Sequence, residues 1–152
     1  MEVLDYFFTN VIVHSYENYT RDSFQAFYRD YAQEIITLYN NYINDFKGEE
    51  SDSEFSLNYF TLAFDALKLF PEFRQTMLAS QHKELEIWTS VIKSAREKGE
   101  IKTNITDLEI AEIFIFLSDG MAMHMIMEGV KIDDMVAPFL NLWDKFYETI
   151  KA

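Results

Sequence analysis

The chain has three histidines that could bind a metal ion, His14, His82 and His124. A di-iron site inside a helical bundle uses Glu-x-x-His motifs, in which a glutamate precedes the histidine by three residues. The residues at that position here are Val11, Ala79 and Met121, so the motif is absent. The HExxH, GxSxG and Walker A motifs are absent as well. We therefore predict no metal site, no cofactor and no catalytic residues, and the chain is not expected to be an enzyme.

Two adjacent carboxylates, Asp133 and Asp134, would suit a divalent cation. The other residues of a prenyl-synthase-type aspartate motif are missing from the sequence. Either aspartate can instead cap the last helix of the chain, where its carboxylate would accept hydrogen bonds from free backbone amides. Capping accounts for both residues, so we predict a helix N-terminus here.

Asp119 and His124 stand inside a long apolar segment, where an unpaired charge is costly to bury. Each therefore needs a hydrogen-bond partner or a water-filled cavity. One interpretation places them in satisfied core hydrogen bonds or at an exposed edge of the bundle. The other places one of them in a ligand pocket or across a dimer seam. The sequence leaves both interpretations open.

Aromatic residues make up 16% of the chain, which is many for an interior that need only be tightly packed. They either fill a solid core or line a cavity for an apolar or aromatic ligand. The methionines 121, 123, 125 and 127 could adapt to varied ligands, but their alternate spacing places them on different faces of a helix. If a cavity exists, the candidate ligand-binding residues are Tyr28, Tyr31, Phe60, Phe64, Trp88, Ile92, Phe116, Asp119, Met123 and His124.

The composition predicts one all-α domain over residues 1–152. Only 4 glycines and 2 prolines leave few turns for a many-stranded sheet, and the absence of cysteine excludes disulfides. The net charge of −13 repels phosphate backbones and anionic lipids, so this chain alone is not expected to bind nucleic acid. The first basic residue is Arg21, and the longest apolar run, 113–117, is too short to span a bilayer. We expect a cytoplasmic protein without membrane contact.

Apolar residues at steps of three and four predict six or seven helices. The expected ranges are about 1–16, 20–47, 54–70, a short helix that begins at Pro71, 81–98, 106–128, and a last helix with Pro138 in its first turn. Thr20 is the predicted N-cap of the second helix. The helix 106–128 is apolar almost all the way round, so both its own domain and a partner are needed to cover it.

Local signals mark several helix ends. Ser51 with Glu54, and Thr106 with Glu109, match the capping box, in which a hydroxyl and a carboxylate satisfy free backbone amides reciprocally. Glycine is the expected residue after a helix C-terminus, and we predict this role for the glycines at 99 and 129.

The central part of the chain resembles the C-terminal regulatory domain of tetracycline-repressor-type (TetR family) transcriptional regulators. The shared pattern is a tryptophan-bearing helix, the motif a-x-E-x-G-E-I, a capped acidic helix start, and an apolar helix with Asp-Gly near its middle. The matching residues are Trp88, Val91, Ile92, Ala95, Glu97, Gly99, Glu100, Ile101, Asp107, Glu109, Ala111, Asp119 and Gly120. The order of expected helices extends the resemblance over nearly the whole chain. The family's N-terminal helix-turn-helix has no counterpart here.

The resemblance implies an effector-sensing, dimerising domain of a transcriptional repressor. In the family, the last two long helices of each subunit form a four-helix dimer interface, and here they correspond to 106–128 and 134–150. A small hydrophobic or aromatic effector would bias a two-state equilibrium that reaches the DNA-binding heads through a connecting helix, here 2–16. The alternative is a structural module that only dimerises. An enclosed apolar cavity would favour sensing, and a tightly filled interior would favour the structural module.

Overall fold

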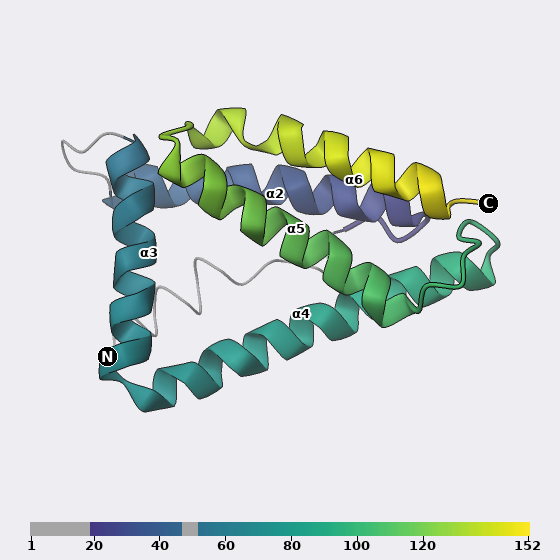
Figure 1. Cartoon of the computed structure of the whole chain (residues 1–152), viewed down its shortest axis with the longest axis horizontal. Coiled ribbons are helices and arrows are strands. Elements are labelled where there is room, and N and C mark those ends of the chain that lie inside the picture. Colours follow the sequence, from purple (N-terminus) through teal and green to yellow (C-terminus); the bar gives the residue numbers. More distant parts are fainter. Residues whose placement is uncertain (1–18, 47–51) are drawn as a thin grey trace.

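The regular structure of this chain is helical wherever it is described. The computed structural model describes residues 19–46 and 52–152. Five α-helices and one short 3-10 turn occur in this part, and Figure 1 labels the α-helices: α2 (Phe24–Phe46), α3 (Asp52–Leu69), α4 (Pro71–Glu97), α5 (Asp107–Met127), η2 (Ile132–Asp134) and α6 (Val136–Ile150). The all-α prediction is confirmed. The predicted helix 1–16 and the capping residue Ser51 lie outside the described residues.

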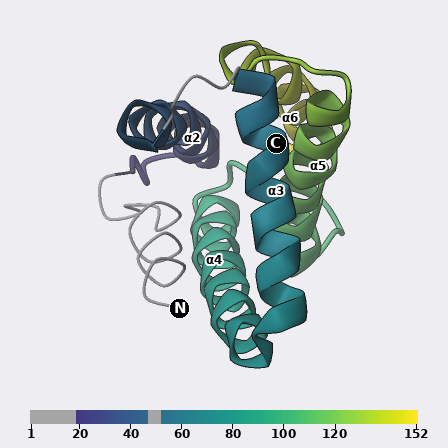
Figure 2. The ribbon, with the colours of Figure 1, turned by 90° about the vertical axis from the view of Figure 1, so that its left-hand side faces the viewer.

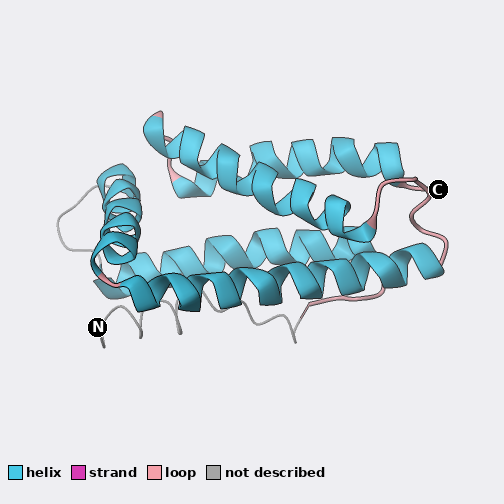
Figure 3. Cartoon of the chain, turned by 60° about the horizontal axis from the view of Figure 1, so that its bottom comes forward, coloured by secondary structure: helices cyan, strands magenta, loops and turns pink. Residues whose placement is uncertain are grey.

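The helices other than α3 run broadly along the length of the molecule, whereas α3 stands across one end (Figures 1 and 2). α5 makes its most extensive contact with α4, and α6 packs mainly against α2. The C-terminus and the loop between α4 and α5 lie at the end opposite α3 (Figure 1). From α3 to the C-terminus, loops and the 3-10 turn η2 connect the helices (Figure 3), and the one extended pairing in the described part is an isolated bridge between Ile101 and Lys151.

α4 is a single helix of 27 residues where the sequence predicted two. Pro71 stands at its start, as predicted, because proline lacks the amide that a first helical residue would leave unpaired. Between Glu72 and Glu97 the sequence contains neither glycine nor proline. Nothing therefore interrupts the backbone hydrogen bonds, and the expected break before residue 81 does not occur.

Two predicted N-caps are wrong. α2 begins at Phe24 rather than after Thr20, and the side chain of Ser23 accepts a hydrogen bond from the Ala26 amide at 3.0 Å. α6 follows Met135 without any side-chain cap, while Asp133 and Asp134 lie in the preceding 3-10 turn. Met135 and Val136 are buried, so apolar packing anchors the start of α6. Pro138 does lie in its first turn, as predicted.

The predicted start of α5 and two predicted helix ends are confirmed. Thr106 and Glu109 form the capping box in full. Gly99 and Gly129 have φ angles of 81° and 73°, the left-handed conformation that favours glycine after a helix.

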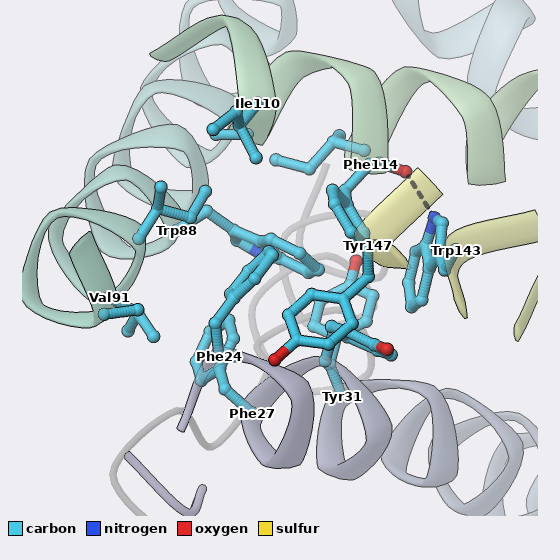
Figure 4. Packing of buried hydrophobic residues seen from close by; sticks show 14 of the residues in the cluster. Phe24, Phe27, Tyr31, Trp88, Val91, Ile110, Phe114, Trp143 and Tyr147 are labelled. Atoms are coloured by element: carbon cyan, nitrogen blue, oxygen red, sulfur yellow. Dashed lines mark hydrogen bonds between the residues drawn. The ribbon is translucent and has the colours of Figure 1, made fainter. Parts of the chain in front are cut away.

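The core is a cluster of aromatic rings contributed by α2, α4, α5 and α6 (Figure 4). The largest fully buried side chains are Trp88, Trp143, Tyr28, Phe24, Phe27, Phe114, Ile92, Ile110 and Ile150. Most ring pairs meet edge to face or tilted, the arrangement that the quadrupoles of aromatic rings favour. The indole of Trp143 also donates a hydrogen bond to the Phe114 carbonyl at 2.9 Å, which ties α6 to α5.

Candidate functional site

Four of the predicted ligand-binding residues belong to the ring cluster. Tyr28, Trp88 and Ile92 have no exposed surface, and Tyr31 is 6% exposed. The ring of Tyr31 meets that of Trp88 edge-on with a centroid distance of 5.0 Å, and Trp88 also contacts Phe114 at 5.8 Å. Figure 4 shows the side chains of Tyr31, Trp88 and Phe114 converging from α2, α4 and α5. At these positions the rings fill the interior.

The two tyrosine hydroxyls of this group are already engaged. Tyr28 donates to Oδ1 of Asp144 at 2.6 Å, and Tyr31 donates to Oε1 of Glu84 at 2.7 Å. Burial, followed by the hydrogen bond to Asp144, raises the pKa of the Tyr28 phenol well above its ordinary value. The phenol therefore remains a protonated donor, and Arg29 holds the second oxygen of Asp144 at 2.6 Å.

Trp88 carries a polar atom that the packing leaves unsatisfied. Its Nε1 is buried and has no hydrogen-bond partner among the described residues. A buried donor without a partner costs about 1–3 kcal/mol. The ring packing of Trp88 must offset this cost, because the side chain is wholly enclosed by the cluster.

Phe60 and Phe64 lie on α3, outside the buried cluster. Their ring centroids are 6.3 Å apart, so they contact each other. Phe60 is half-buried, whereas Phe64 is 55% exposed. Neither belongs to the set of residues that surrounds Trp88.

The remaining four predicted residues lie on α5. Phe116 is 58% exposed, Asp119 and His124 are also exposed, and Met123 is half-buried. The ten predicted residues are therefore divided among the core, α3 and the outer side of α5. They do not converge on one pocket in the described part of the chain. Aromatic side chains at helical spacing occur here in the core, on α3 and on the outer side of α5, so the spacing alone does not identify a pocket.

The two polar residues of α5 have different surroundings. The Nε2 atom of His124 lies 3.1 Å from Oε1 of Glu128, one turn further along the same helix. The Asp119 side chain is open to solvent on one side, but protein atoms displace much of the water around its carboxyl group. This desolvation and the nearby Glu84 carboxylate raise the pKa of Asp119 to about 6. These residues thus lie at the edge of the helix bundle.

The outward side of α5 carries an apolar stripe that residue types alone did not single out. Its members follow one another at alternating steps of three and four residues: Ile113, Phe116, Gly120, Met123 and Met127. Ile113, Phe116 and Met127 are exposed, with Met127 at 69%. A Cβ atom at Gly120 would meet no other atom within 4 Å, so the middle of the stripe is open. We call this set the α5 stripe.

A shallow depression adjoins one end of the α5 stripe. It is open to solvent and is lined by Asn104, Ile105, Glu109, Glu112, Ile113, Phe116 and Leu117. Leu108 on α5 and Leu142 on α6 are further exposed apolar side chains of these two helices. The alternating spacing of the α5 stripe could have been read from the sequence. It was hidden because the opposite side of the helix is equally apolar.

The described structure also bears on metal binding and on membrane insertion. Among the described residues, no group of three or more His, Asp or Glu side chains is placed to hold a metal ion. By length and composition alone, α5 is apolar enough to cross a membrane, a property that it shares with core helices of soluble proteins.

No protein-family model, no curated protein and no solved structure matches this chain.

Proposed function

We propose that this chain is the effector-sensing and dimerisation domain of a TetR-type transcriptional repressor. The support lies in the order of the helices, in the a-x-E-x-G-E-I turn that ends α4, and in the capped acidic start of the apolar helix α5. DNA binding would belong to a helix-turn-helix outside this chain. The net charge of −13 agrees with that division, because an acidic surface repels phosphates.

The observation that carries the proposal of dimerisation is the exposed α5 stripe. The proposal of effector sensing is supported by the helix order and the shared motif alone. Alternating steps of three and four residues are typical of helices that pack side by side against other helices. Transfer of one phenylalanine side chain from water to an interface is favourable by about 1.5–3 kcal/mol, so an uncovered Phe116 favours a partner. Gly120, in the middle of the stripe, would allow two helices to approach closely.

We propose a second copy of this chain as that partner, with α5 and α6 of each copy forming the four-helix interface. A membrane is a poorer partner for the same surface. Asp119, His124 and Glu128 lie at or near the exposed side of α5, and ionisable groups are expensive to place inside a bilayer. The proposed location is accordingly the cytoplasm.

The test of dimerisation is the molar mass in solution. We expect the wild-type chain, of 18.0 kDa, to show twice that mass by light scattering at micromolar concentration. Phe116→Asp should return the mass to that of one chain. Phe64→Asp is the matched control, because Phe64 is as exposed as Phe116 but lies on α3. A wild-type mass of one chain, or equal dissociation by both substitutions, would refute the interface.

The test of sensing is stabilisation by a ligand. A small hydrophobic or aromatic effector at 100 times its dissociation constant should add about 2.7 kcal/mol to the free energy of unfolding. A thermal-shift screen of such compounds would detect this gain. The filled ring cluster around Trp88 favours the second candidate function, a domain that only dimerises. That candidate predicts a dimer whose melting temperature no compound in the screen raises.

A further inference from the structure

The turn that follows α4 contacts two other helices at the end of the molecule opposite α3. Gly99 adopts a left-handed conformation, which reverses the chain and allows the Glu100 side chain to reach the first residues of α2. The Glu100 carbonyl accepts a hydrogen bond from the Ala152 amide at 2.9 Å, and the Lys102 amide donates to the Ile150 carbonyl at 2.7 Å. The same short turn is therefore attached to the end of α6.

The Glu100 carboxylate satisfies the backbone amides that begin α2. The first amides of a helix have no partner within the helix. Glu100 accepts from the Phe24 amide at 2.9 Å through Oε2 and from the Gln25 amide at 3.2 Å through Oε1. Ser23 satisfies the next amide. A carboxylate is also favoured at this position because the N-terminus of a helix carries partial positive charge.

The same carboxylate oxygen is bonded to α6. Oε1 of Glu100 accepts a hydrogen bond from the Tyr147 hydroxyl at 2.9 Å. Tyr147 is buried, and its ring packs against Phe24, with 6.3 Å between the centroids (Figure 4). Burial and the hydrogen bond to Glu100 raise the pKa of the Tyr147 phenol above its ordinary value, so it remains a donor. One oxygen atom is thus shared between α6 and the first turn of α2.

The chain segment that leads into α2 is held by the same turn. The Lys98 ammonium donates to the Arg21 carbonyl at 3.2 Å. Tyr19 is buried in the core, where its ring meets that of Phe27. The Thr20 amide also donates to Asp30 at 2.7 Å, and Phe24 is buried in the ring cluster. Lys98 and Glu100 add the attachment of residues 19–25 to the turn that follows α4.

We propose that Glu100 is a positioning residue that couples α6 to the start of α2 and to the segment leading into it. A role of this coupling in regulation rests on the proposed function, in which α6 belongs to the dimer interface. A movement of α6 that withdraws the Tyr147 hydroxyl leaves Oε1 of Glu100 free to turn. The hydrogen bonds to the Phe24 and Gln25 amides then weaken, and the chain preceding α2 is held less firmly.

The test is amide hydrogen exchange resolved by residue, with NMR detection, on the Tyr147→Phe variant. This substitution keeps the buried ring and removes only the hydroxyl. Exchange at Phe24 and Gln25 should accelerate about 2- to 10-fold, the range that corresponds to the loss of one hydrogen bond. The Ile115 amide, in the buried middle of α5, reports global stability, and the acceleration at α2 should exceed the change at Ile115.

Tyr28→Phe is the matched control, because it removes the other tyrosine hydroxyl that links α2 to α6, through Asp144. It should leave the ratio of Phe24 exchange to Ile115 exchange unchanged. If Tyr147→Phe changes this ratio no more than Tyr28→Phe does, the coupling through Glu100 is overturned.

A second arm connects the coupling to the dimer. Phe116→Asp should accelerate exchange at Phe24 and Gln25 selectively in the wild-type background and add nothing in the Tyr147→Phe background. If Phe116→Asp halves the molar mass without affecting these amides, the link between Glu100 and the interface is wrong. If the wild-type chain is already a monomer, the proposed function fails, whereas the effect of Tyr147→Phe still decides whether Glu100 couples α6 to α2.

Discussion

The two sides of α5 are similar in composition but differ in what covers them. The inward side, with Ile110, Phe114 and Ile115, is buried against the ring cluster. The outward side, with Phe116 and Met127, is largely exposed. Phe114 and Phe116, two residues apart on one helix, therefore occupy opposite environments. An apolar helix needs cover on all sides, but the single chain covers α5 on one side only.

The inward side should dominate the stability of the folded chain. Phe114 contacts Phe24, Trp88 and Trp143, with centroid distances of 4.9, 5.8 and 5.5 Å. Phe114→Ala should lower the free energy of unfolding by about 3–5 kcal/mol, because it removes buried surface and leaves a cavity in a rigid cluster. Urea denaturation followed by tryptophan fluorescence measures this change. A loss below about 1 kcal/mol would mean that the cluster around Phe114 is loosely packed.

The outward side should govern association instead. Phe116→Ala is expected to weaken dimerisation by about 2 kcal/mol, the cost typical of an aromatic residue at the centre of an interface. Sedimentation at several concentrations measures the dissociation constant. At concentrations where the chain is already a monomer, the same substitution should change the unfolding free energy by less than about 0.5 kcal/mol. Equal losses in the monomer for Phe114→Ala and Phe116→Ala would remove the distinction between the two sides.

The start of α5 belongs to neither side, and its contribution to the free energy of unfolding should be intermediate. The Thr106 hydroxyl accepts from the Glu109 amide at 3.3 Å, and the Glu109 carboxylate accepts from the Thr106 amide at 2.9 Å. The Thr106 hydroxyl also donates to the Glu109 carboxylate at 2.7 Å, and this hydrogen bond, followed by the one from the Thr106 amide, lowers the pKa of Glu109. Thr106→Ala should cost about 1 kcal/mol of unfolding free energy. Thr106→Ser, which keeps the hydroxyl, is the control and should recover most of the loss. Equal losses in both variants would show that the hydroxyl is unimportant.

Local rules were sufficient to predict much of the fold from the sequence. Pro71, Gly99 and the Thr106–Glu109 box act through hydrogen bonds and backbone angles within a few residues, so their roles could be predicted from the sequence alone. The start of α6 could not be predicted, because burial of Met135 and Val136 against distant residues decides it. The continuous α4 could have been predicted, because no residue between 72 and 97 breaks a helix and the expected break before residue 81 had no glycine or proline to cause it.

The candidate site was harder to predict than the fold. Aromatic residues at helical spacing occur in a filled core, in a ligand cavity and on an interface. Residue type could therefore not separate Trp88 from Phe64 or Phe116, although the first is fully buried and the other two are more than half exposed. The alternating steps of the α5 stripe were a usable signal. The equally apolar inward side concealed it, because the few polar side chains of α5, such as Asp119 and His124, were equally compatible with a core hydrogen bond, a pocket or an exposed edge.

Asp119 stands at the border between the two sides of α5, and its substitution should have the smallest effect on the free energy of unfolding. Its pKa of about 6 in the folded chain exceeds the ordinary value of 3.8, because desolvation and the Glu84 carboxylate disfavour the charged form. The folded state therefore binds the proton more tightly than the unfolded state. The contribution of Asp119 to stability falls as the pH rises from about 4 to about 6 and is constant above that range.

Asp119→Asn should remove this dependence and stabilise the chain at pH 7. The gain should be about 1 kcal/mol or less, because the side chain is partly open to solvent. Thermal unfolding of both proteins between pH 4 and pH 8 measures the difference, and Asp134→Asn controls for the loss of one negative charge. If the variant is no more stable than the wild type at pH 7, the Asp119 carboxyl is as well solvated as an ordinary surface aspartate. Asp119 then belongs to the exposed side of α5.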